Sequence, residues 1–521
     1  MSQSSSARPS SYLHRACENC RHRKIRCDGE RPVCRRCRLQ PPRSLTPCKY
    51  SHGTTGGVSP PLDIGSEQEP ADIVLSDPYL AHSLGAVATL KHNEQLDGWN
   101  NAMYKSTPSP IEELPELTGT MMDIFLRHFT RHQFFFLDSV RFQQSTLLPT
   151  VNPDHPPVGL LHTICLWANH ISPTSVALSM YSEEDLLARA VRSHATDVAT
   201  IGDAPRLLHL IQAEVLLSFY YLDCGCSMEG NYHRAAATSL ALTARLHQLG
   251  TPSQSRYSTL DFFNVNLAAP GDAIRARELV NAFWSVVVLN NYWVAASGTP
   301  SNIPSDAPIN TPWPTDHSVA PLVPNMSFSV PVDSRDNDVQ GHSAFTLLAK
   351  ASILLERTVA FTIQYPEAHL ASQALPLPLE FWTIEHRLDS FRGHLLLDTS
   401  ETSQMSLITH VFANTAILRL GGPNCAICAV ARSKCLTAAN CVSTRLNEAR
   451  LDEWNQADPI LGPLLGIVAD ALMGILPHVP QAAPDLQTTL AALHTLSRWS
   501  PLIRQCLAAT QQQYATLGFL G

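Results

Sequence analysis

The sequence has no long uninterrupted hydrophobic run. Its most apolar stretch, from Ile460 to Val479, is broken by Pro463, Asp470 and Pro477. A membrane-spanning helix needs about 20 consecutive apolar residues, and an unpaired carboxylate at its centre is costly. The stretch therefore favours a buried helix over a membrane span, and no membrane partner is expected.

The N-terminus lacks the apolar core of a signal peptide, because residues 1–15 are mainly small and polar. We therefore expect the chain to stay in the nucleocytoplasmic compartment, where thiols are kept reduced. Six of the 14 cysteines fall between Cys17 and Cys48. In a reducing compartment, this concentration indicates metal ligation and not disulfide bonding.

Runs of alternating apolar and polar residues, which are typical of strands, are scarce, and there is no internal repeat of solenoid quality. At 521 residues, with 44% hydrophobic and 16% charged, the chain can bury a sizeable core. We predict a mainly α protein.

The composition changes along the chain and predicts four parts. Residues 1–15 are expected to be disordered, and residues 16–50 form a small cysteine-rich domain. Residues 51–113 form a flexible linker rich in Gly, Pro, Ser and acidic residues. Residues 114–521 form a large all-α domain, with a Pro-rich connection near residues 298–338.

A short helix is expected within the linker, starting at Asp77. Its heptad pattern places Lys91 and Glu94 at seam positions, which a stable coiled coil does not tolerate. Any dimer is therefore expected to form through the helical region.

Four segments of the large domain show helical character clearly: residues 117–137, 205–224, 228–250 and 273–297. In the third segment, eight residues fall on one helical stripe: Met228, Tyr232, Ala235, Ala236, Ser239, Leu240, Thr243 and Leu246. Gly250 suits the C-cap of that helix.

Charge is distributed very unevenly. The first 50 residues contain twelve Lys or Arg and three Asp or Glu, a net charge of +9. The remaining residues contain 25 and 42, a net charge of −17, so the chain totals −8. The N-terminal end is therefore suited to meet a polyanion, and the rest is not.

The six clustered cysteines follow the spacing C-x2-C-x6-C-x6-C-x2-C-x10-C: Cys17, Cys20, Cys27, Cys34, Cys37 and Cys48. Two separate tetrahedral zinc sites would need eight ligands, but six thiolates suffice if two sulfurs bridge both metals. No histidine takes a ligand-like position. A segment this short could not fold on its own apolar core, so metal ligation must hold it together.

This segment closely resembles the fungal zinc binuclear cluster, the six-cysteine DNA-binding domain of a large class of fungal transcription regulators. The shared features are the six cysteines, the basic "CRHRKIRC", the "CDGERPVC" loop with Pro32, and the trailing Tyr50. The resemblance implies two zinc ions ligated by all six cysteines, with Cys17 and Cys34 as the bridging ligands. The ten-residue gap before Cys48 is longer than is usual in the family.

The basic residues between the cysteines support the same interpretation. "RHRKIR" holds four cations in six residues, and four more arginines follow before residue 39. A solvated basic patch or a nuclear localisation signal is the alternative. The resemblance implies base contact in the major groove by Lys24, with Arg23 beside it, and phosphate contacts by Arg21, Arg26 and their neighbours. Lysine pairs with O6 and N7 of guanine, and similar proteins read CGG triplets. The predicted DNA-binding residues are Arg21, Arg23, Lys24, Arg26, Arg35 and Arg36.

The rest of the chain resembles the fungal-specific middle homology region, a helical domain commonly found behind such clusters. The matching stretches begin at Phe129, Gly230, Arg275 and Ile309. The resemblance implies a regulatory role in inhibition, effector response or partner binding, and it names no effector.

Two motifs raise the question of catalysis. "GCSMEG" at Gly225 misses the nucleophile-elbow pattern by one residue and is expected in a loop before a helix, not after a strand. His128 and His132 have metal-ligand spacing but lack the adjacent glutamate of a zinc protease. We predict no catalytic residue.

Three other groups have ordinary structural interpretations. Four cysteines lie in an Ala-rich helical stretch and are expected to pack as small core residues, with a metal or redox site as the alternative. They are Cys425, Cys428, Cys435 and Cys441. Phe134, Phe135 and Phe136 are expected in the core, and the linker acids are expected to give spacing and solubility, with an activation segment as the alternative.

These features predict a nuclear, zinc-dependent, sequence-specific DNA-binding regulator of RNA polymerase II transcription. Double-stranded DNA and the transcription machinery are its expected partners. The alternative is a zinc-stabilised module that binds protein or RNA on a helical scaffold without reading duplex sequence.

Overall fold

The computed structural model describes residues 115–172, 182–199, 204–250, 272–304, 309–314, 343–365, 377–395, 403–425 and 428–516. The chain divides into two units, Met1–Val74 and Leu75–Gly521. All of the described residues belong to the second unit.

The described residues form α-helices and short turns of 3-10 helix and contain no strand, which confirms the prediction of a mainly α protein. The helices of the N-terminal half are α4 (Pro115–Phe129), α5 (Ser139–Ser145), α6 (Val158–Ile171), α7 (Glu183–Ala199), α8 (Ala204–Cys224), α9 (Ser227–Thr243) and α10 (Ala273–Ser297). Those of the C-terminal half are α11 (Ala344–Gln364), α13 (Leu379–Leu395), α14 (Gln404–Gly421), α15 (Ala429–Glu448), α16 (Leu461–Ile475), α17 (Ala483–Leu496) and α18 (Pro501–Thr516).

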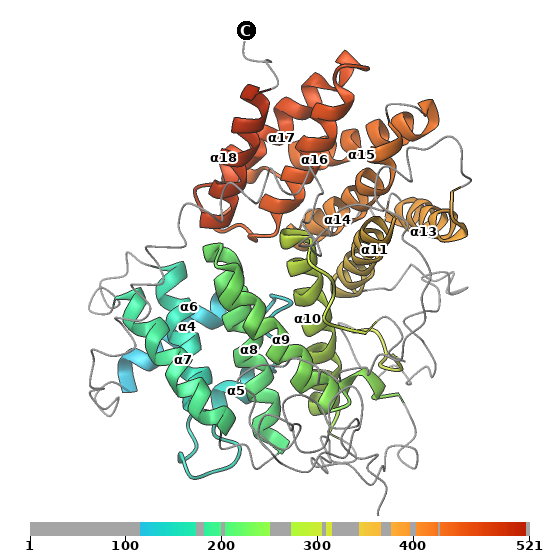
Figure 1. Ribbon diagram of the computed structural model, residues 1–521. Helices are drawn as coiled ribbons and strands as arrows, with labels where there is room; N and C mark the ends of the chain where they lie inside the picture. The colour runs from blue at the N-terminus through green and yellow to red at the C-terminus, as the bar shows by residue number, and fades with distance from the viewer. Residues whose placement is uncertain are drawn as a thin grey trace, which may run out of the picture. The chain divides into compact units, whose positions relative to one another are not determined.

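Helix α10 connects the two halves (Figure 1). It packs against α8 and α9 of the N-terminal half and against α11 and α16 of the C-terminal half. The side chain of Asp272 caps its start by accepting from the Arg275 backbone N–H, and Gly298 ends it in the left-handed conformation with φ 65°. These end signals explain why the predicted range 273–297 agrees with the observed helix.

Two apolar helices that raise the membrane question lie in the core. Of the described helices, α10 alone is long and apolar enough to cross a membrane, but 89% of its apolar stretch is buried in the protein. Most of α16 is buried as well, including Asp470. The prediction that the stretch around α16 forms a buried helix is confirmed.

The first predicted helical segment is shorter than expected, because α4 ends at Phe129. Beyond it, the chain turns through Phe134 to Phe136, whose rings are buried as predicted. Gln212 of α8 replaces the missing helical hydrogen bonds: its Nε2 donates to the Phe134 carbonyl (2.7 Å) and its Oε1 accepts from the Phe136 N–H (3.0 Å). Satisfied backbone groups allow the aromatic run to leave the helix and still be buried.

The third predicted segment also ends early. Helix α9 stops at Thr243, Arg245 takes a left-handed conformation with φ 55°, and the 3-10 turn η2 (Leu246–Gln248) follows. Gly250 is therefore not the C-cap, and its N–H donates to the Asn310 carbonyl (2.8 Å).

The predicted stripe on α9 exists, but most of it faces away from the core. Leu240 is the exception within α9, because it is half-buried and packs against the core. The exposed members of the stripe are Met228, Tyr232, Ala235, Ser239 and Thr243. The buried face carries six other residues: Gly230, His233, Arg234, Ala237, Thr238 and Ala241. Polar residues can form the inner face because they find partners there, such as Glu214 of α8 for the His233 ring (2.6 Å).

The described parts of the Pro-rich connection, residues 298–304 and 309–314, pack along α10. Trp284 of α10 donates from Nε1 to the Pro312 carbonyl (2.6 Å), and its ring stacks on Trp313 with centroids 4.2 Å apart. The rest of the connection lies outside the described residues.

Candidate functional site

The predicted metal and DNA-binding residues all lie outside the described residues. So do the predicted linker, residues 51–113, and its short helix. The metal ligands concerned are Cys17, Cys20, Cys27, Cys34, Cys37 and Cys48, and the DNA-binding residues are Arg21, Arg23, Lys24, Arg26, Arg35 and Arg36. The donor chemistry of this set fits zinc, because thiolates are among its preferred ligands.

The two motifs that raised the question of catalysis lie in turns and at helix ends of the helical region. Gly225 takes a left-handed conformation with φ 74° between α8 and α9, so "GCSMEG" follows a helix and not a strand, as predicted. His128 is exposed in the last turn of α4, whereas His132 lies in the turn beyond it. The ring of His132 packs near Phe129, Phe134 and Phe219, and burial lowers its pKa to about 3.

The four cysteines near α15 divide into two pairs. Cys425 and Cys435 are buried, as predicted for small core residues. Cys428 is exposed at the start of α15 and Cys441 is half-buried, so the core prediction is wrong for these two. Cys428 precedes the first turn of the helix, and Cys441 lies outside the buried face of α15. Among the described residues, no group of three or more His, Cys, Asp or Glu side chains is arranged to hold a metal ion.

The helical region contains three buried polar clusters that the sequence did not reveal. The first surrounds His170 of α6. Its Nδ1 lies 2.6 Å from Glu183 of α7, and its Nε2 lies 2.7 Å from Asp223 of α8. Burial opposes the charged imidazole, but the hydrogen bonds and charges of the two carboxylates outweigh it and raise the pKa of His170 to about 9. His170 is therefore a cation at neutral pH that ties α6 to α7 and α8.

The second cluster joins α7, α8 and α9 through Glu214. Its Oε1 lies 2.8 Å from His194 Nε2, and its Oε2 lies 2.6 Å from His233 Nδ1. Burial favours the neutral acid, but the hydrogen bonds and charges of the two histidines outweigh burial and lower the pKa of Glu214 below its ordinary value. This carboxylate fixes the inward rotation of α9.

The third cluster joins the N-terminal half to the segment before α16. Asp458 Oδ2 accepts from Nε2 of Gln133, which follows α4, and from the hydroxyl of Tyr292 in α10, both at 3.1 Å. Asp458 Oδ1 accepts from the Ile460 N–H at 3.0 Å. Burial raises the pKa of Asp458 to about 7 in spite of these hydrogen bonds. Asp458 thus titrates near neutral pH at the junction of the two halves.

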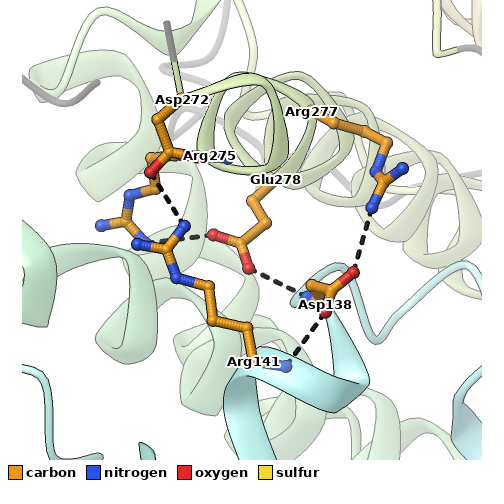
Figure 2. Close-up of polar contacts among 6 residues, drawn as sticks. All are labelled: Asp138, Arg141, Asp272, Arg275, Arg277 and Glu278. Atoms are coloured by element: carbon orange, nitrogen blue, oxygen red, sulfur yellow. Dashed lines mark hydrogen bonds and ion pairs between the residues drawn. The ribbon is translucent and has the colours of Figure 1, made fainter. Parts of the chain in front are cut away.

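A surface network joins the starts of α5 and α10 (Figure 2). Asp138 caps α5 and accepts from Arg277 of α10 (3.0 Å), while Asp272 caps α10 and accepts from Arg141 of α5 (2.9 Å). Glu278 accepts from the Asp138 N–H (2.9 Å) between them. Each helix therefore supplies an arginine to the cap of the other, which sets their relative orientation. Partly exposed pairs of this kind add little stability individually.

Each of these clusters joins side chains from separate elements of the helical region. The two partners of His170 lie 13 and 53 residues away, and Gln133 lies 325 residues from Asp458. No local pattern signals such pairs. Their common effect is to hold the helical region in one arrangement through charge-assisted hydrogen bonds.

Both the cysteine-rich segment and the helical region match known protein families. Residues 15–55 match the family model of the fungal Zn(2)-Cys(6) binuclear cluster domain. Residues 122–389, just over half of the chain, match that of the fungal specific transcription factor domain. No solved structure matches.

One curated relative is the trypacidin cluster transcription factor of Aspergillus fumigatus. It is 32% identical over 120 residues, which cover 22% of this chain and 28% of that protein. The match thus spans less than a third of the relative. Both family models describe transcription factor domains and not enzymes. The chain therefore belongs to the fungal Zn(2)-Cys(6) transcription factors, zinc-binding regulators of transcription.

Proposed function

We propose that this transcription regulator acts in the nucleus by binding duplex DNA sequence-specifically and controlling genes read by RNA polymerase II. The observation that carries the proposal is the six-cysteine spacing with basic residues between the cysteines, within the stretch that matches the binuclear cluster domain. The transcription machinery is the expected partner of the helical region.

The six cysteines Cys17, Cys20, Cys27, Cys34, Cys37 and Cys48 are the proposed metal ligands. Two zinc ions would supply the cross-links that let a segment this short keep one shape. Cys17 and Cys34 are the proposed bridging ligands, so that each belongs to both metal sites.

The basic residues would divide between reading and holding the DNA. Lys24 is the proposed base reader in the major groove, where its ammonium can donate to guanine O6 and N7 of a CGG-type triplet, and Arg23 lies beside it. The proposed phosphate contacts are Arg21, Arg26, Arg35 and Arg36. Phosphate contacts position the protein on the duplex but do not select its sequence.

The remainder of the chain would regulate and not bind the phosphate backbone. Residues 51–521 carry a net charge of −17, which repels a polyanion. This leaves the helical region available for protein partners, an effector or a second copy of the chain.

The test compares two substitutions in the zinc-loaded full chain. A preferred site is first selected from a random duplex library. Lys24→Ala should then lose about 1–3 kcal/mol on the preferred duplex and much less on a scrambled one. Arg26→Ala should weaken binding to both duplexes similarly and reduce the salt slope by about one unit.

Both variants keep all six cysteines, so equal zinc content serves as the folding control. If Lys24→Ala weakens both duplexes equally, Lys24 is a phosphate contact and the base-reading role is wrong. If the library yields no preferred sequence, the cluster is a zinc-stabilised protein- or RNA-binding module and not a reader of duplex DNA.

A further inference from the structure

Two buried cysteines meet at the end of α14. The Cys425 thiol donates to the Gly421 carbonyl (3.4 Å), and a Cβ added at Gly421 would come within 2.8 Å of Cys435 Sγ. Both sulfurs therefore lie against the same glycine, although Cys425 follows the 3-10 turn η4 (Gly422–Asn424) and Cys435 belongs to α15. We call Cys425 and Cys435 the thiol pair. Its two side chains are 5% and 0% exposed.

The two thiols differ in reactivity. A hydrogen bond from Cys435 lowers the pKa of Cys425, and the charge of Arg432 adds to this effect against burial. The same hydrogen bond, together with burial, raises the pKa of Cys435. Burial instead raises the pKa of Cys165 and of Cys506 to about 12. The thiolate is the nucleophilic form of cysteine, so Cys425 is the reactive member of the pair and Cys435 its neutral partner.

The backbone between η4 and α15 holds Arg432 beside the pair. Its Nε donates to the Cys425 carbonyl (2.8 Å), and its N–H donates to the Cys428 carbonyl in the first turn of α15 (3.0 Å). The Cys428 N–H in turn donates to the Asn424 carbonyl (2.8 Å). These hydrogen bonds fix the connection between the two elements that carry the thiol pair. A disulfide requires its two sulfurs to lie close together, and here they do so while still reduced.

We propose that Cys425 and Cys435 form a redox-sensitive pair, which hydrogen peroxide oxidises to a disulfide that links the end of α14 to α15. In a reducing compartment the pair rests as two thiols. The competing partner for Cys425 is Cys428, at Cys-x-x-Cys spacing, but its side chain is exposed, whereas Cys435 hydrogen-bonds to Cys425. The inference goes beyond the proposed function, because it assigns to the helical region a covalent site unconnected with DNA binding.

The reaction takes place in two steps. The Cys425 thiolate attacks one oxygen of the peroxide, and the O–O bond breaks. Cys425 becomes a sulfenic acid, and the departing hydroxide takes up the proton that the thiol had lost. The Cys435 sulfur then attacks the Cys425 sulfur, so that an S–S bond forms and the S–O bond breaks. The oxygen leaves as water with the Cys435 proton. Two thiols lose two electrons, one peroxide becomes two waters, and a dithiol reductant reverses the change.

Peptide mapping of the oxidised chain tests the proposal. Trypsin separates the pair, because Cys425 falls in peptide 420–432 and Cys435 in peptide 435–445. The zinc-loaded full chain is treated with hydrogen peroxide in the absence of DNA, its remaining thiols are alkylated, and the digest is analysed by mass spectrometry. The two peptides should appear joined, and dithiothreitol should separate them. Cys165, which is buried without a thiol partner of lowered pKa, should be recovered as the alkylated thiol.

Two variants identify the sulfurs. The double variant Cys428→Ala/Cys441→Ala removes the second cysteine from each peptide, at an exposed and a half-buried position, and should form the joined species like the parent. Cys435→Ala should abolish the joined species and leave Cys425 as a sulfenic acid, which dimedone traps with a defined increase in mass. The two variants differ only in whether the thiol pair is intact.

The contrary outcomes are distinct. Peptides that stay separate in the oxidised parent overturn the proposal, as does a disulfide between Cys425 and Cys428 within peptide 420–432. Joined peptides that disappear in the double variant assign the link to other cysteines, and oxidation of Cys165 as fast as the pair removes its selectivity. The zinc ligands lie on other tryptic peptides, so their oxidation is counted separately. Because no DNA is used, failure of the thiol pair is separate from failure of base preference.

Discussion

Replacing Gly230 by alanine should destabilise the helical region, because this glycine is where α9 meets α10. An added Cβ would lie 2.1 Å from one atom of the Trp293 ring and 2.4 Å from another. The Trp293 ring cannot move away from the added methyl group without a cost in free energy. The tryptophan is 2% exposed, and its Nε1 is hydrogen-bonded to Ser218.

The magnitude follows from three contributions. Forcing an extra methyl group into a packed core costs about 1–3 kcal/mol, and an overlap this severe belongs at the upper end. Displacing Trp293 also weakens its hydrogen bond to Ser218, which is worth about 1 kcal/mol. Alanine favours the helix over glycine by about 1 kcal/mol, which offsets part of the loss. The net effect is a loss of about 2–3 kcal/mol.

The measurement is urea unfolding of the zinc-loaded full chain, with tryptophan fluorescence as the probe of unfolding. Gly119→Ala in α4 is the matched control, because an added Cβ there meets nothing within 4 Å. It should gain up to about 1 kcal/mol from helix propensity. If Gly230→Ala unfolds at the same midpoint as the parent, with unchanged emission, the close contact between α9 and Trp293 is wrong.

The remaining predictions concern the charged cluster at His170 and the metal. His170→Gln should cost about 3 kcal/mol at pH 6, because it removes the cation between Asp223 and Glu183. The folded pKa of His170, about 9, lies above its ordinary value, so this stabilisation is complete below about pH 6.5 and is lost as the pH rises through 9. Urea midpoints of parent and variant should converge over that window, and a constant gap would contradict the assignment. Separately, Cys17→Ala or Cys34→Ala should lose both zinc ions in a metal analysis of the purified chain, and one tightly held zinc in both variants would refute the bridging role.

The helix ends and the core helices were predictable where the signals are local. The range of α10 follows from Asp272 before it and Gly298 after it, together with the apolar sequence between them. The burial of α16 follows from its composition, because an apolar helix interrupted by Asp470 has no stable place in a bilayer. In both cases the deciding residues lie within or next to the element itself.

The orientation of α9 could not be predicted, because it depends on distant partners. By composition the stripe from Met228 to Thr243 is the more apolar face, so periodicity points it toward the core. The observed inner face contains His233, which pairs with Glu214, and Arg234, whose Nη2 donates to Asn302. Those partners belong to another helix and to the segment after α10, and no local rule brings them together.

The two parts of the chain depend on different forces, which makes them separable by experiment. A cysteine-rich segment of this length has too little apolar surface for a core and needs its metal to fold. The helical region instead has a continuous core from α4 to α18. Among its described residues, no group of three or more His, Cys, Asp or Glu side chains is arranged to hold a metal ion. Chelation should therefore abolish DNA binding while leaving the urea midpoint of the helical region unchanged, because its packing involves no zinc. Gly230→Ala should do the reverse, lowering that midpoint without changing base preference, since the residues proposed to read bases lie in the other unit.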